Sequence, residues 1–344
     1  MIQSLTVRPY RVEWAAPTGN ARGRFREREG LLIELRDAEG RAGRGEAAPL
    51  SGRTEEHLDA CRDALSSLDA KALPRDFRAA GHLLPPRFTA ARHALESSLL
   101  ELEALRLEVP AWQVLALELG RTTPVVALEA AALVDQQTLA EALDGARRAI
   151  ELGFRTLKLK IGREPVERIV ERTRAVERAF PGTRLRLDAN QTLSPDEARS
   201  LSRSLRDSPI EFLEEPFEGA TSSSVEVSLA LDESLQDPDL DVSKAEASVL
   251  VLKPMVLGLA RCLEIARAAP ASSKLVISHC FDGPLAMAAA RALSLALGPG
   301  RPADGLGGHA VLAAWPDGVP ERLRGPLIEP WNERGFGILT RSDA

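Results

Sequence analysis

The chain has 344 residues, a net charge of -6, 44% hydrophobic and 27% charged residues, a composition ordinary for a globular protein, and no apolar run nears the roughly 20 residues of a membrane span. The negative charge and an aromatic content of only 4% are weak evidence against nucleic-acid binding. The length exceeds a usual single core of about 250 to 300 residues, so we expect one large domain with a smaller companion.

The start of the chain reads as a strand. Residues 1–14 carry Arg8, Arg11 and Glu13, so they lack the basic and then apolar pattern of a signal peptide. The three cysteines form neither a spaced metal motif nor an even-numbered disulfide set: Cys61, Cys262 and Cys280. These observations predict a cytoplasmic protein without membrane segments.

The first hundred residues predict a small α+β unit, strands first and helices after. Between the first two strands, residues 15–29 contain Pro17, several glycines and several arginines, and we interpret them as a mobile loop. Helices are expected to begin at Thr54 and at Thr89, the first ending near residue 68 and the second near 107. The strands are expected at 4–14, 30–36 and 43–46.

From residue 125 onward, short apolar runs alternate with helical patterns at a spacing of about 20 to 30 residues, as in βα units. Eight parallel strands close most simply into a barrel, whose active site lies at the carboxyl ends of the strands. We therefore predict a capping domain at 1–108, completed by residues from about 312 to 344, and a barrel domain at 109–311. The eight strands are expected at 125–128, 157–161, 185–188, 210–214, 228–232, 248–253, 275–278 and 304–306.

Three of these strands end in acids, namely Asp188, Glu214 and Asp232. Three converging carboxylates repel one another unless a cation lies between them. A hard divalent ion with oxygen ligands resolves the conflict, and we expect Mg²⁺, with Mn²⁺ as the alternative.

Lysines lie at the ends of two other strands. Only six of the 44 basic residues are lysines, and arginine cannot serve as a base because its pKa exceeds about 12. Lys158 and Lys160 share one face of the second barrel strand, and Lys253 ends the sixth strand, almost opposite. A metal flanked by amines can support removal of a proton alpha to a carboxylate. The substrate is therefore expected to be a small carboxylate.

Five short motifs follow one another on consecutive strands: Lys-x-Lys, Asp-Ala-Asn, Glu-Glu-Pro, Asp-Glu-Ser and Lys-Pro. In this order they resemble the enolase superfamily, specifically its muconate-lactonizing subgroup. The resemblance covers almost the whole chain, including the segment Gly45-Glu-Ala-Ala-Pro-Leu50 near the N-terminus. It implies a (β/α)8-type barrel in the modified (β/α)7β form, with an N-terminal α+β capping domain.

The resemblance also implies roles for single residues. Asp188, Glu214 and Asp232 would be the metal ligands, and Lys160 and Lys253 the acid/base pair, supported by Lys158. Weaker candidates for substrate contact or indirect support complete the site: Arg186, Asn190, Glu233 and Ser278. The oligomeric state stays open.

Within the subgroup, the motifs most resemble enzymes that dehydrate a succinyl-substituted cyclohexadiene carboxylate to an aromatic product. Three features favour this activity: Arg186 two residues before Asp188, the segment Arg28-Glu-Gly-Leu-Leu, and the run that extends from Gly45 to Gly52. Racemisation of N-succinylamino acids and epimerisation of dipeptides are the alternatives. Dipeptide epimerases usually carry Asp-x-Asp on the eighth strand, where this chain has only Asp304-Gly-Leu. A barrel that binds without catalysis is the remaining alternative.

Three further side chains attract attention, and we assign none of them to catalysis. His279 and His309 are interpreted as loop residues. Cys280 follows His279 directly, and neighbours on a strand point in opposite directions, so the two cannot act as a thiol and its base.

Overall fold

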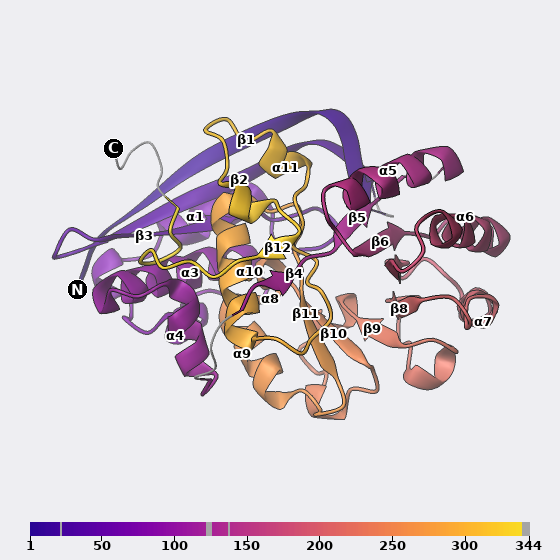
Figure 1. Cartoon of the computed structure of the whole chain (residues 1–344). Helices are drawn as coiled ribbons and strands as arrows, with labels where there is room; N and C mark the ends of the chain where they lie inside the picture. The colour runs from indigo at the N-terminus through magenta and orange to yellow at the C-terminus, as the bar shows by residue number, and fades with distance from the viewer. Residues whose placement is uncertain (21–22, 122–125, 137, 339–344) are drawn as a thin grey trace.

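The computed structural model describes residues 1–20, 23–121, 126–136 and 138–338. A curled parallel sheet with outer helices forms a barrel, and a unit of strands and helices from the N-terminal part of the chain packs against one side of it (Figure 1). The predicted α/β barrel with an N-terminal capping unit is therefore confirmed. Among the described residues, no helix is long and apolar enough to cross a membrane.

The N-terminal unit begins with an antiparallel sheet of order β1-β2-β3. The strands are β1 (Ile2–Asn20), β2 (Gly23–Asp37) and β3 (Ala42–Ala47). The prediction of a mobile loop at 15–29 is wrong, because β1 and β2 continue as one long hairpin in which Thr18 pairs with Phe25 and Asn20 with Gly23. Backbone hydrogen bonds form such a ladder whatever the side chains are, so the glycines and arginines concealed it. Residues 21 and 22 lie outside the described residues.

Helices cover the inner face of this sheet. The predicted helix at Thr89–Leu107 is confirmed as α3, whereas the helix expected from Thr54 begins only at Leu58. The elements are α1 (Leu58–Ser66), η1 (Ala70–Ala72), α2 (Phe77–Ala80), η2 (Gly81–Leu83), α3 (Thr89–Leu107) and α4 (Ala111–Glu118).

The barrel sheet contains seven parallel strands in chain order. They are β5 (Ala132–Val134), β6 (Thr156–Lys160), β7 (Arg184–Asp188), β8 (Ile210–Glu214), β9 (Leu229–Leu231), β10 (Val249–Leu252) and β11 (Lys274–Ile277). Single parallel bridges join Ser278 to Gly305 and Ala130 to Asp304. The segment at 304–305 thus lies between the two edges of the sheet and takes the eighth position.

The first barrel strand was predicted one element too early. β4 (Leu128–Glu129) pairs antiparallel with β12 (Leu327–Ile328), outside the barrel sheet, and the barrel begins with β5. The two strands are three residues long or less and follow each other within one apolar stretch, so periodicity cannot separate them. Residue 125, the start of the predicted strand, lies outside the described residues.

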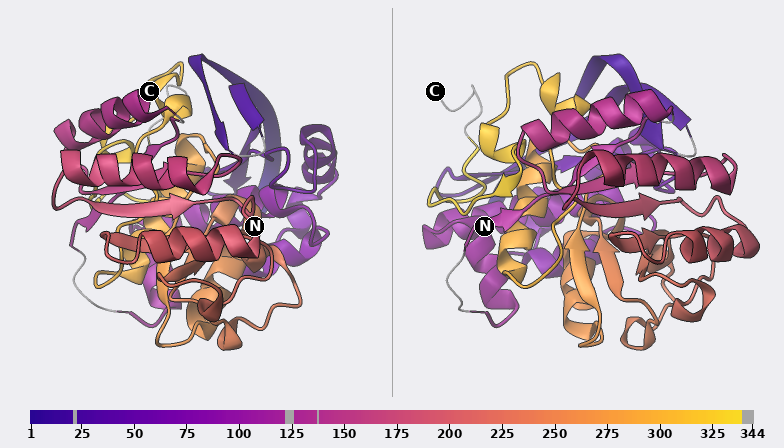
Figure 2. Two further views of the ribbon diagram at one scale, coloured as in Figure 1. Left: turned by 90° about the vertical axis from the view of Figure 1, so that its right-hand side faces the viewer. Right: turned by 45° about the vertical axis from the view of Figure 1, so that its right-hand side comes forward.

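Helices α5, α6 and α7 lie side by side on the outside of the barrel (Figure 2). All residues of α10 are buried, and this helix runs through the middle of the molecule between the barrel and α4 (Figure 1). The elements of this part are α5 (Leu139–Glu151), α6 (Val166–Ala179), α7 (Pro195–Ser204), η3 (Ser222–Ser224), η4 (Glu233–Gln236), η5 (Val242–Lys244), α8 (Pro254–Leu257), α9 (Leu259–Ala268), α10 (Pro284–Leu297), α11 (Ala310–Ala313) and η6 (Glu321–Leu323).

The C-terminal segment returns to the N-terminal elements. The indole nitrogen of Trp112 in α4 donates to the carbonyl of Trp331 at 2.9 Å, and Arg44 in β3 donates to the carbonyl of Ile338 at 3.0 Å. The contact of Arg44 agrees with a capping unit that the end of the chain completes, whereas Trp112 lies just after the proposed unit. We retain the boundaries at 108 and 311 as a proposal.

Candidate active site

The register of the barrel strands brings the predicted residues to one edge. Lys160 pairs with Asp188, and Asp188 pairs with Glu214. Asp232 follows β9 directly, and Lys253 follows β10. Because parallel strands end at the same edge of a barrel, all these side chains gather at its carboxyl-terminal end.

The lysines contact the acids directly. Lys158 Nζ lies 2.8 Å from Asp188 Oδ2 and 2.6 Å from Glu214 Oε2. Lys160 Nζ lies 2.6 Å from Asp188 Oδ2. Lys253 Nζ donates to Asp232 and lies 3.7 Å from Glu214 Oε1. The acids, Lys158 and Lys253 are buried, and the side chain of Lys160 is only 12% exposed. This burial strengthens every charge interaction in the network.

The three lysines differ in their tendency to lose a proton. Burial lowers the pKa of Lys160, Asp188 raises it in part, and the neighbouring cations of Lys158 and Lys253 lower it further. Burial also lowers the pKa of Lys253, but its acidic neighbours outweigh this effect and the net shift is upward. The pKa of Lys158 is also raised, because the charges of Asp188 and Glu214 outweigh the effect of burial. Lys160 is thus the amine most easily made neutral, as a base must be.

The three acids offer only hard oxygen donors, the type that Mg²⁺ prefers. As they stand, no three His, Cys, Asp or Glu side chains within the described part of the chain are arranged to hold one ion. The lysine ammonium groups lie between the carboxylates, which shows that this position favours positive charge. The donor chemistry therefore fits Mg²⁺, which Asp188, Glu214 and Asp232 would hold.

Three of the weaker candidates lie in the same network or beside it. Asn190 accepts from Lys160 Nζ at 2.6 Å and donates to Glu233 Oε1 at 3.1 Å. Burial, and then the charge of Asp232, raises the pKa of Glu233 to about 7. Ser278 lines the cavity described below.

Arg186 lies elsewhere. Its Nε donates to Glu211 at 2.7 Å, and its guanidinium stacks over the ring of Phe212 at 4.7 Å. Phe212 belongs to the small apolar cluster of the inner strands. The sequence left open whether Arg186 has a catalytic role or is a structural partner of Glu214 or Asp232, but the ion pair that forms is with Glu211.

Two residues of the site were missed by the sequence reasoning. Arg53, in the turn after β3, is buried and forms ion pairs with Asp232 and Glu233. Glu215 accepts from the backbone of Asp232 at 2.9 Å and of Ser234 at 2.8 Å, and so fixes the direction of the chain after β9. Arg53 directly follows the run that ends at Gly52, which was a signal for this turn.

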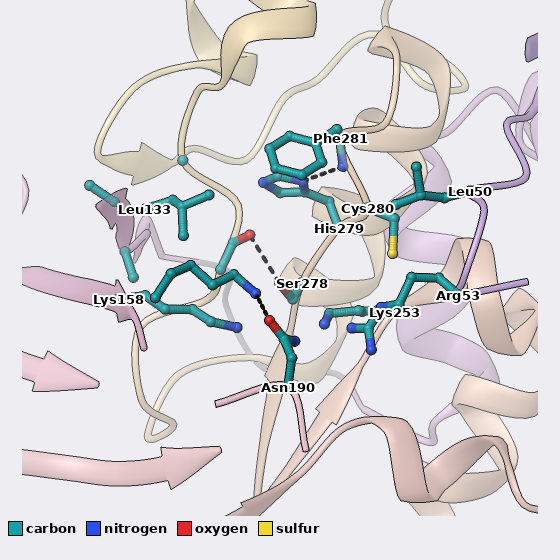
Figure 3. Close-up of a pocket in the computed structure, with 15 residues that line it drawn as sticks. Leu50, Arg53, Leu133, Lys158, Asn190, Lys253, Ser278, His279, Cys280 and Phe281 are labelled. Atoms are coloured by element: carbon teal, nitrogen blue, oxygen red, sulfur yellow. Dashed lines mark hydrogen bonds between the residues drawn. The ribbon is translucent and has the colours of Figure 1, made fainter. Parts of the chain in front are cut away.

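A cavity that is partly open to solvent lies above this network. Figure 3 shows His279 and Phe281 together at one end, and the amines of Lys158 and Lys253 with the side chain of Asn190 at the other. The lining contains four basic side chains and, among the described residues, no acidic one. It consists of Leu50, Arg53, Ala131, Ala132, Leu133, Lys158, Lys160, Asn190, Lys253, Ser278, His279, Cys280, Phe281, Gly305 and Gly307.

The two histidines are loop residues, as expected, but His279 also forms part of the cavity wall. Its ring stacks on that of His309 with a centroid distance of 4.3 Å, and its Nδ1 accepts from the backbone of Phe281 at 3.0 Å. Burial raises the pKa of the Cys280 thiol, which disfavours the reactive thiolate.

The family model described as enolase C-terminal domain-like matches residues 141–344. The chain therefore belongs to the enolase superfamily, and it fits the muconate-lactonizing subgroup that its motifs resemble.

Its relatives have different activities. The L-Lys-D/L-Arg epimerase of Methylococcus capsulatus is 31% identical, over 73% of this chain and 69% of the relative. The o-succinylbenzoate synthase of Aliivibrio salmonicida is 28% identical, over 77% of this chain and 78% of the relative. The structure of the dipeptide epimerase from Enterococcus faecalis, complexed with Mg and a dipeptide, has a TM-score of 0.85 at 23% identity and covers 98% of this chain and 99% of its own. Identity alone does not choose between synthase and epimerase.

Proposed function

We propose that the protein is an o-succinylbenzoate synthase, a Mg²⁺-dependent lyase of menaquinone biosynthesis. It would convert 2-succinyl-6-hydroxy-2,4-cyclohexadiene-1-carboxylate to o-succinylbenzoate and water. This activity is one of those found in the superfamily to which the chain belongs.

The charge of the cavity carries this proposal. The lining has four basic side chains and, among its described residues, no acidic one, because the acids that pair with these side chains lie behind the cavity wall. A substrate with two carboxylates complements this lining, whereas a dipeptide brings an ammonium group that needs an acid nearby.

In the proposed reaction, neutral Lys160 removes the proton from the ring carbon that bears the carboxylate. The electron pair left on that carbon forms the new ring double bond as the carbon–oxygen bond to the hydroxyl breaks. The ammonium of Lys160 returns its proton to the departing hydroxyl, and water leaves. Lys253, held as a cation beside Asp232, faces the ring as a cation against a π system.

When bound, Mg²⁺ would take up negative charge that develops on the substrate carboxylate. The other parts of the reaction belong to the chain itself. Asn190 accepts from Lys160 Nζ and so directs this amine, while Lys158 adds positive charge beside Asp188 and Glu214.

The direct test is the ultraviolet absorbance of the cyclohexadiene substrate, freshly prepared and mixed with the purified protein. We expect rapid loss of the diene band with Mg²⁺ and no loss beyond the uncatalysed rate with EDTA, because an unneutralised carboxylate opposes proton removal. Restoring excess Mg²⁺ should restore the rate. Persistence of the band with Mg²⁺ would contradict the synthase assignment.

Racemisation or epimerisation on the same lysines is the second candidate, favoured by the relative that is 31% identical. In such a reaction Lys160 and Lys253 would exchange the proton from opposite faces. Deuterium incorporation from D₂O into N-succinylamino acids or dipeptides measures this directly. If neither exchange nor dehydration occurs, a barrel that only binds becomes the better interpretation.

The role of Asp304 provides a further test of the epimerase alternative. It is the acid nearest the position of the Asp-x-Asp pair, but it is buried and accepts from Arg301 Nη1 at 2.9 Å and from the backbone of Ile277 at 2.7 Å. We expect Asp304→Asn to lower the free energy of unfolding by about 3–5 kcal/mol, because it breaks a buried ion pair. Thermal denaturation measures this loss, and the KM of the folded fraction should not change. A raised KM with an unchanged melting temperature would instead assign Asp304 to the substrate.

A further inference from the structure

Two motifs of the N-terminal unit contain buried charges that the proposed reaction does not use. Arg28 lies in β2 and Glu46 in β3, and both are buried. Neither lines the cavity. Both nevertheless contact segments that do.

Arg28 joins two walls of the cavity. Its Nε donates to the carbonyl of Phe281 at 3.2 Å, and its Nη1 donates to the carbonyl of Pro49 at 2.7 Å. Its Nη2 donates to the carbonyl of Ala48. The segment that follows Ala48 and Pro49 contains Leu50 and Arg53, which line the cavity. Phe281 is itself a lining residue. One planar guanidinium, with its donors in a fixed fork, therefore holds the two walls at one separation.

Glu46 fixes the second wall from its other end. It accepts from the backbone of Gly283 at 2.6 Å, at the N-cap position just before α10, and of Ala286 at 3.2 Å, in the first turn of this helix. Carboxylates are favoured at this end of a helix, because the first amides have no partner within the helix. The hydroxyl of Tyr10 donates at 2.7 Å to Glu46 Oε1, the same oxygen that accepts from the amide of Gly283.

Two glycines leave room for these contacts. A Cβ at Gly283 would lie 2.5 Å from Glu46 Oε1, so the carboxylate can approach the helix only at a glycine. A Cβ at Gly30 would lie 2.5 Å from the ring of Tyr10, which pairs with Gly30 across the hairpin. The segments that begin at Arg28 and at Gly45 thus contain both buried charged residues, Arg28 and Glu46, and one of the two glycines that leave room for them, Gly30.

We infer that Arg28 and Glu46 are positioning residues that set the distance between the turn at 50–53 and the segment at 279–281, and thereby determine affinity for the part of the substrate remote from Lys158 and Lys160. The second half of this inference rests on the proposed function, since the lysines are taken to hold the reacting end. Figure 3 places Leu50 and Arg53 on the side of the cavity away from Lys158, with the guanidinium of Arg53 beside Lys253, and His279 and Phe281 at the upper end.

The first experiment measures hydrogen–deuterium exchange in Arg28→Lys, which keeps the charge but loses the fork. We expect at least about tenfold faster exchange in both walls, at the amides of Arg53 and Thr54, which donate to Leu50, and at the amide of Gly283. Arg44→Lys is the matched control, because Arg44 is also an arginine of the N-terminal antiparallel sheet but hydrogen-bonds to Glu101 and Ile338. Faster exchange in one wall only, or in neither, would overturn the bracing role. This readout needs no ligand and stands even if the proposed function fails.

The second experiment measures binding to the Mg²⁺-loaded protein by calorimetry, with o-succinylbenzoate and with benzoate. We expect Arg28→Lys and Glu46→Gln each to weaken o-succinylbenzoate at least about tenfold and benzoate less than about twofold. In kinetics, KM should rise while kcat changes less than about threefold. Equal weakening of both ligands would indicate general loss of structure and overturn the role in affinity. Failure of the wild-type protein to bind o-succinylbenzoate would overturn both that role and the proposed function, and the exchange result would still decide the bracing.

Discussion

Replacing Lys160 by alanine is expected to reduce turnover of the cyclohexadiene substrate by about 10²- to 10⁴-fold, the usual contribution of a general base. Its amine is the one whose pKa burial and neighbouring cations lower, and it lines the cavity beside Asn190. The effect should appear in kcat, because the proton is transferred only in the transition state. Single-turnover absorbance measurements at saturating Mg²⁺ would show it.

The fold should survive this change. Asp188 keeps Lys158 as its partner at 2.8 Å, and removal of one amine relieves repulsion among the three lysines. Lys274→Ala is the control, because Lys274 is exposed at the opposite end of the barrel, where β11 begins, and should leave turnover and melting temperature unchanged. If Lys160→Ala keeps wild-type turnover, Lys160 is not the base.

The site was predictable where it depends on strand ends. Lys158, Lys160 and Asp188 are close to one another because β6 and β7 pair in register, and alternation along a strand already placed both lysines on one face. The barrel then needs no further information to bring acids and lysines together. Alternation does not predict how deep in the barrel a side chain lies. Arg186 shares the face of Asp188 but lies below the network, where it pairs with Glu211.

The parts that were not predictable depend on contacts between distant segments. Arg53 reaches Asp232 across 179 positions of the chain, and no local pattern encodes such a contact. The long hairpin was missed for a related reason, since β1 and β2 stabilise each other through backbone pairing while their sequence resembles a loop. The eighth barrel position consists of single bridges at Asp304 and Gly305, too short for any periodicity to be counted.

Replacement of Asp232 by asparagine has the second large expected effect. Burial alone raises the pKa of Asp232, but Arg53 and Lys253 outweigh it and hold the pKa below its usual value. The group is therefore a full carboxylate at neutral pH and a strong candidate ligand. We expect the variant to bind Mg²⁺ at least about 10- to 100-fold more weakly, since loss of residues that only support metal ligands already costs that much. Calorimetric titration with Mg²⁺, without substrate, measures this affinity.

Loss of this charge also leaves Arg53 and Lys253 with fewer acidic partners, so the variant is expected to melt at a lower temperature. Asp304→Asn separates the two effects, because it removes another buried carboxylate paired with an arginine away from the metal site. Both variants should lose stability, but only Asp232→Asn should lose affinity for Mg²⁺, and its activity should recover in part at high Mg²⁺ concentration. An unchanged Mg²⁺ affinity in Asp232→Asn would remove this residue from the ligand set and leave it as the partner that holds Arg53 and Lys253 at the cavity wall.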